Sequence, residues 1–188
     1  MADKKRSAAA EYIRIVLVLL IICAVTSGVV AGVNALTKDR IAENLEMQIK
    51  SSISEMFGEG IEYTTLAEIP AGVEAVYEIV RGSEIMYCAN INSSGFGGDV
   101  NMLVGLAKDG TVIGVSVVSH SETPGLGSIA AESGFLGQFA GVNNPDKVDS
   151  IAGATISSEA VKAGIAEAQR ILDEAGIIDY EKQEVKGQ

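Results

Sequence analysis

The chain has 188 residues, a mean hydropathy of +0.27 and a formal net charge of −11. This length allows one modest domain and an anchor. It contains no tryptophan and only 5% aromatic residues. The acidic charge and the scarcity of aromatic residues exclude the basic, stacking surfaces of nucleic-acid-binding proteins, so we expect no nucleic-acid partner.

Residues 15–37 form one uncharged, strongly apolar segment near the N-terminus. A membrane-spanning helix needs about 20 such residues. Four basic residues lie in the preceding segment 1–14, which predicts a cytoplasmic N-terminus and an extracytoplasmic domain after the helix. A cleaved signal peptide is the alternative, but the apolar run is longer than a typical signal core. We therefore expect a single-pass anchor in the cell membrane.

The anchor contains small residues that permit close packing against partner helices, although they also resemble a signal-peptidase site. They are Ser27, Gly28, Ala31 and Gly32. We expect a connecting amphipathic helix in residues 38–60 because apolar side chains recur every fourth position. These are Ile41, Leu45, Ile49, Ile53 and Phe57. Gly58 and Gly60 are expected to end that helix.

Residues 61–180 have the pattern of one α+β domain, with a mostly antiparallel sheet flanked by helices. Alternating or continuous apolar runs between turn residues predict the strands. These are residues 73–80, 84–92, 102–107 and 111–118, with a short additional strand at 147–151. We expect turns at Arg81-Gly82 and at residues 108–110. A final helix over residues 157–175 is expected to end at Gly176, and residues 181–188 to form a polar tail.

The two cysteines, Cys23 and Cys88, are far apart in the sequence and lack the spacing of metal ligands. We interpret both as small packing residues rather than as a disulfide. We therefore predict no metal site, and no catalytic residue stands out.

The segment Asp149-Ser150-Ile151-Ala152-Gly153-Ala154-Thr155 places small residues directly before a predicted helix. Gly153 permits unusual backbone angles, and a helix N-terminus favours a phosphate. Local chemistry alone favours a simpler interpretation, in which Thr155 or Ser157 caps the helix.

A second segment, His120-Ser121-Glu122-Thr123-Pro124-Gly125-Leu126-Gly127, lies about 30 residues earlier. Pro124-Gly125 suits the centre of a type II turn. Glycines at 125 and 127 allow the backbone to approach a ligand closely. His120 is the sole histidine, and without a partner nucleophile it is a weak catalytic candidate.

Both segments, in this order, resemble the FMN-binding domain family. The resemblance implies that a separate flavin transferase joins FMN through a phosphoester to Thr155. It implies that the transferase recognises Asp149, Gly153, Ala154 and Thr155. Ala152 departs from the family pattern, which often has Ser or Thr there. The implied cofactor-binding residues are Thr155, Glu122, Thr123, Gly125, Leu126, Gly127, Gly153, Ala154, Ser157 and His120.

The single anchor and the chain length are similar to the G subunits of Rnf-type electron-transport complexes. That resemblance implies a redox subunit that is not catalytic alone, within a sodium- or proton-translocating ferredoxin:NAD oxidoreductase. The other membrane subunits would be its partners. The alternatives are the C subunit of a sodium-pumping NADH:quinone reductase, a stand-alone extracytoplasmic electron shuttle, and a non-redox anchored interaction domain.

Overall fold

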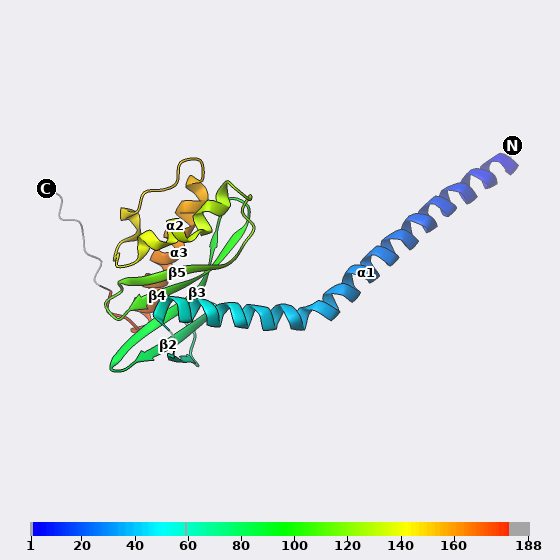
Figure 1. The fold of residues 1–188 in the computed structure, drawn as a ribbon. Helices are drawn as coiled ribbons and strands as arrows, with labels where there is room; N and C mark the ends of the chain where they lie inside the picture. The colour runs from blue at the N-terminus through cyan, green and yellow to red at the C-terminus, as the bar shows by residue number, and fades with distance from the viewer. Residues whose placement is uncertain (1, 59, 181–188) are drawn as a thin grey trace. The chain divides into compact units, whose positions relative to one another are not determined.

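The computed structural model describes residues 2–58 and 60–180, in which one long helix precedes a five-stranded sheet with further helices (Figure 1). The chain separates into two compact units, Met1–Glu46 and Met47–Gln188. The predicted polar tail at 181–188 lies outside the described residues.

The first unit is helical and belongs to α1 (Ala2–Phe57). By length and composition this helix can cross a membrane, and its most apolar window has a mean hydropathy of 2.8. Two threonine side chains of the apolar segment are compatible with lipid because they bond within the helix. The Thr26 hydroxyl donates to the Ile22 carbonyl at 2.9 Å, and the Thr37 hydroxyl donates to the Val33 carbonyl at 2.8 Å.

The segment 38–60, predicted as a connecting amphipathic helix, is helical to Phe57, and α1 continues into it without a break. No glycine or proline interrupts residues 37–57, so nothing in the local sequence ends the helix earlier. Its predicted end is confirmed, since Gly58 follows with a φ of 98° and donates to the Ser54 carbonyl at 2.9 Å.

Five antiparallel strands form the sheet in chain order. They are β1 (Glu62–Thr65), β2 (Ala75–Arg81), β3 (Glu84–Ser94), β4 (Asp99–Ala107) and β5 (Val112–His120). The α+β class and the four main strands are confirmed. β1 was not predicted because its four residues are mostly exposed and show no apolar alternation. Arg81 pairs with Glu84, so the β2–β3 turn is Gly82-Ser83 rather than Arg81-Gly82.

The predicted strand at 147–151 is wrong. Pro145 instead begins the 3-10 helix η3 (Pro145–Lys147), and the Asn144 side chain accepts from the Asp146 N–H at 2.9 Å. Val148 then buries its side chain without a strand partner. Val148 is therefore buried by packing alone. A short alternating pattern in the sequence does not distinguish such a packed segment from a strand.

The sheet has a hydrophobic layer on each face because successive strand residues point to opposite sides. On one face, Met102 and Val104 of β4 pack in the cluster that includes the apolar side of α3 (Thr155–Glu174). On the other face, Leu103 packs with Ile53 and with other residues at the end of α1.

The final turns of α1 belong to the second unit. Of the predicted apolar stripe, Ile49, Ile53 and Phe57 are buried against the sheet, whereas Ile41 and Leu45 are exposed. Cys88 is fully buried in the same layer, and burial raises the pKa of its thiol. Both cysteines are free thiols, as predicted.

Candidate functional site

The helix α3 begins at Thr155, two residues before its predicted start. The N-cap residue is Ala154, and no side chain caps the helix. The expectation that Thr155 or Ser157 is the cap is therefore wrong. Gly153 has a φ of 85°, which turns the chain into the helix, and Thr155 follows as an exposed first residue. The site thus presents an accessible hydroxyl at an uncapped helix N-terminus.

Ser158 holds this loop in place from within the helix. Its hydroxyl donates to the Ala154 carbonyl at 2.9 Å and accepts from the Ile151 N–H at 3.1 Å. The Ser158 side chain is fully buried. The backbone before Thr155 is therefore positioned by α3 itself, which leaves the Thr155 side chain on the exposed side of the first turn.

The loop after β5 contains the predicted type II turn. The Leu126 N–H donates to the Thr123 carbonyl at 3.1 Å, and Gly125 has the required positive φ of 73°. The Gly125 N–H also donates to the Ser128 hydroxyl at 2.9 Å. This turn directs the chain from β5 into the 3-10 helix η1 (Gly127–Ala131).

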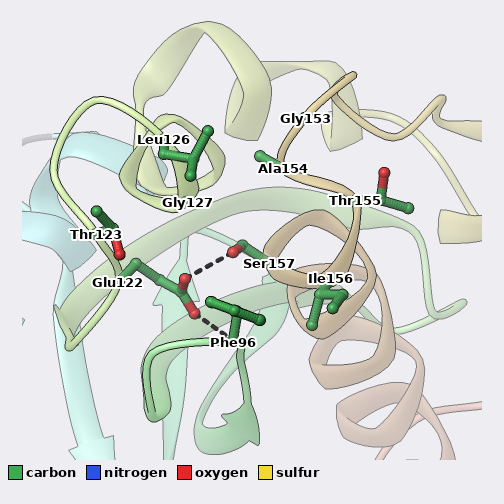
Figure 2. Close-up of a pocket in the computed structure, with 10 residues that line it drawn as sticks. All are labelled: Phe96, Glu122, Thr123, Leu126, Gly127, Gly153, Ala154, Thr155, Ile156 and Ser157. Atoms are coloured by element: carbon green, nitrogen blue, oxygen red, sulfur yellow. Dashed lines mark hydrogen bonds between the residues drawn. The ribbon is translucent and has the colours of Figure 1, made fainter.

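Glu122 is the buried polar centre of the site, with 6% of its surface exposed. Its Oε1 accepts from the backbone N–H groups of Phe96 at 2.8 Å and Gly97 at 3.2 Å. Its Oε2 accepts from the Ser157 hydroxyl at 2.7 Å (Figure 2).

Burial by itself raises the pKa of Glu122. This effect is outweighed by the hydrogen bonds from Ser157, Gly97 and Phe96 and by the nearby His120, so the pKa lies below its usual value. The site therefore holds a buried carboxylate in its charged form.

A pocket of about 290 Å³ lies between these segments. Its lining residues are Phe96, Glu122, Thr123, Leu126, Gly127, Gly153, Ala154, Thr155, Ile156 and Ser157 (Figure 2). The structure thus brings together eight of the ten predicted cofactor-binding residues. Gly125 serves the turn instead, and the exposed His120 accepts the Glu122 N–H at 3.2 Å through Nδ1. Asp149 is exposed and also lies outside the lining.

Sequence reasoning missed Phe96 and Ile156. Phe96 is the one aromatic residue in the glycine-rich segment 93–99, and Ile156 directly follows the modified position that the resemblance implies. Together with Leu126 they form an exposed apolar rim, with exposed fractions of 69% for Phe96, 51% for Leu126 and 55% for Ile156. An apolar rim of this kind suits a flat apolar ring system, because binding removes its surface from water.

The residues fit a phosphorylated flavin on these observations. The uncapped start of α3 offers backbone N–H groups to a phosphate. The neighbouring apolar rim offers contact area to the ring. In residues 2–58 and 60–180, no group of three or more His, Cys, Asp or Glu side chains forms a candidate metal site.

Two family models match the chain. The FMN-binding domain matches residues 95–170, and the RnfG N-terminal region matches residues 11–56. The chain is 31% identical to the G subunit of the proton-translocating ferredoxin:NAD(+) oxidoreductase complex of Clostridium ljungdahlii, over 80% of this chain and 85% of that protein. It is 28% identical to the G subunit of the ion-translocating oxidoreductase complex of Methanosarcina acetivorans, over 86% and 92% of the two chains.

Among solved structures, the chain is similar to the C subunit of the Na(+)-translocating NADH-quinone reductase from Parabacteroides distasonis. The TM-score is 0.48 and the sequence identity is 18%, over 71% of this chain and 85% of that one.

Proposed function

From the premise that the chain belongs to the family of G subunits of ion-translocating oxidoreductase complexes, we propose that it relays electrons within such a membrane complex through a covalent FMN on Thr155. The relative from Clostridium ljungdahlii belongs to a ferredoxin:NAD(+) oxidoreductase complex. By this relationship the redox partners of this chain are other subunits of the complex. The chain is then one redox-active subunit of a larger enzyme and does not catalyse the reaction alone.

The observation that carries the proposal is the exposed Thr155 hydroxyl beside an apolar pocket at an uncapped helix start. A bound FMN supplies one- and two-electron transfer. The backbone N–H groups at the N-terminus of α3 would hold the phosphate. The rim of Phe96, Leu126 and Ile156 would give apolar contact to the ring. The tether keeps the cofactor on the protein while leaving its ring able to approach a partner.

Attachment requires a second protein. A phosphoester forms when Thr155 Oγ displaces a leaving group from the flavin phosphate, so the flavin donor must carry that phosphate in an activated linkage. A separate flavin transferase supplies the activated donor. Its proposed recognition segment includes the exposed Asp149, Gly153 and Thr155 together with Ala154.

The test is co-expression of the full chain with a flavin transferase, followed by denaturing gel electrophoresis and ultraviolet illumination. Wild type should give a fluorescent band. Thr155→Val keeps the side-chain shape without the hydroxyl and should be dark, whereas Thr155→Ser keeps a hydroxyl and should retain fluorescence. A dark wild-type band refutes the covalent flavin, and a fluorescent Thr155→Val band places the attachment elsewhere.

The helix of residues 10–57 and the membrane-complex relatives support a membrane location. We further propose that residues 1–14 are cytoplasmic and the FMN domain is extracytoplasmic, because basic residues precede the apolar segment. A thiol-reactive probe that cannot cross membranes tests this in intact cells. In a Cys23→Ala background, Glu132→Cys should be labelled and Ser7→Cys should be protected. The reverse pattern would invert the topology.

A further inference from the structure

Three segments that are distant in the sequence meet at one carboxylate. Glu122 lies on the loop after β5, Phe96 and Gly97 lie in the β3–β4 turn, and Ser157 lies in the first turn of α3. The three hydrogen bonds to the Glu122 carboxylate measure 2.8, 3.2 and 2.7 Å. Between them, these segments supply every residue that lines the pocket except those just before α3.

The neighbouring glycines make space for this carboxylate. A Cβ on Gly95 would overlap Glu122 Oε1, and a Cβ on Gly127 would overlap Glu122 Oε2. Gly127 does not have a positive φ, so its lack of a side chain serves this close packing and not the turn. Gly95 and Gly127 therefore share one physical reason, namely room for a buried anion.

We infer that Glu122 is a positioning and tuning residue of this site: it holds the β3–β4 turn against the start of α3, and its buried charge lowers the reduction potential of the FMN. The tuning part rests on the proposed function, and the positioning part does not.

The positioning follows from the direction of the hydrogen bonds. Phe96 is exposed and belongs to a short turn, so its place in the rim depends on its backbone rather than on packing. Its N–H and that of Gly97 both donate to Glu122. Ser157 donates to the other oxygen of the same carboxylate, so the rim residue Ile156 and the attachment residue Thr155 are linked to Phe96 through one side chain.

The tuning follows from the charge of Glu122, whose buried carboxylate lies in the pocket lining. Adding an electron to a flavin adds negative charge, which a nearby buried carboxylate disfavours. Like charges inside a protein repel through an effective dielectric constant of about 20, well below that of water, so this repulsion would shift the reduction equilibrium of a bound flavin. A neutral side chain of the same shape should therefore make the flavin easier to reduce.

Glu122→Gln separates the two roles. The amide oxygen can still accept from Phe96 and Gly97, and the amide nitrogen can donate to the Ser157 hydroxyl, so the contacts persist without the charge. Glu122→Ala removes both the contacts and the charge. Glu132→Gln is the matched control, because it removes the same charge from an exposed position outside the pocket.

Potentials are measured by redox titration of the FMN-loaded full chain in detergent. The potential of Glu122→Gln should be more positive than that of wild type, by more than the shift of Glu132→Gln. A potential equal to that of the control, or more negative than wild type, would overturn the tuning role.

Amide hydrogen exchange on the unloaded chain tests the positioning independently of any flavin. Exchange at Phe96 and Gly97 should be roughly fivefold faster or more in Glu122→Ala and should return to the wild-type rate in Glu122→Gln. Equal rates in Glu122→Ala and wild type would overturn the positioning role. If wild type takes up no FMN on the gel, the proposed function fails, while the exchange rates still decide the positioning.

Discussion

Replacing Ser157 with alanine tests the hydrogen bond that joins α3 to the loop after β5. The Ser157 hydroxyl is buried and donates at 2.7 Å to Oε2 of Glu122, which is itself buried. In Ser157→Ala, that oxygen loses its side-chain donor while the carboxylate stays charged. Hydrogen bonds to charged groups contribute about 1.5–3 kcal/mol, so we expect the free energy of unfolding to fall by about 2 kcal/mol.

The Cys88 thiol provides the assay. It is fully buried in β3 and its pKa is raised, so it reacts with a thiol reagent only when the domain opens. In a Cys23→Ala background, labelling of the full chain in detergent is followed against urea concentration. The midpoint should shift downward in Ser157→Ala. Ser133→Ala, at an exposed position, is the control and should change stability by less than about 0.5 kcal/mol.

A double-mutant cycle measures the coupling free energy between Ser157 and Glu122. In Glu122→Gln the group facing Ser157 is a neutral amide N–H that donates to the hydroxyl, so adding Ser157→Ala should cost less than it does in wild type, by about 1 kcal/mol. If Ser157→Ala lowers the free energy of unfolding equally in both backgrounds, the charge of Glu122 does not strengthen this hydrogen bond. A Ser157→Ala effect no larger than that of Ser133→Ala refutes the buried hydrogen bond itself.

The same thiol assay checks the first two of three further predictions, whereas circular dichroism during urea unfolding checks the third, because too little reactive thiolate remains at acidic pH. Gly127→Ala should lose roughly 1–3 kcal/mol because its methyl group would overlap the Glu122 carboxylate, whereas Gly134→Ala enters open space and should not. Ile53→Ala should lose roughly 2–5 kcal/mol as a core truncation, and the exposed Ile41→Ala should leave the domain unchanged. Because the pKa of Glu122 is lowered from 4.5, its stabilising contribution is complete above that pH and is lost as the pH falls through the folded-state pKa. The stability difference between wild type and Glu122→Gln should therefore shrink on acidification below about pH 4.5, and a difference that grows would contradict the assignment.

Local patterns in the sequence predicted much of the architecture. The uncharged segment 15–37 predicted the anchor, and the alternating residues of β2 and β5 predicted strands, because each signal lies within one element. The turn at Pro124-Gly125 was also predictable, since its requirement for a positive φ is met by the residue itself. The boundaries of α1 and α3 were less accurate, because neither has a side-chain signal at the point where the anchor meets the domain or where α3 begins.

The two motifs likewise contain most of the residues that line the pocket. What tertiary structure decided is how they meet. Glu122 bonds to Phe96, 26 positions earlier, and to Ser157, 35 positions later. These contacts depend on the register of β3, β4 and β5 and on the packing of α3 against the sheet. No local sequence pattern specifies either of them. The sequence by itself therefore determined the anchor, the hairpins and the candidate attachment residue. Only the assembled sheet and α3 placed a buried carboxylate at the centre of the pocket, because its hydrogen-bond donors come from segments that folding alone brings together.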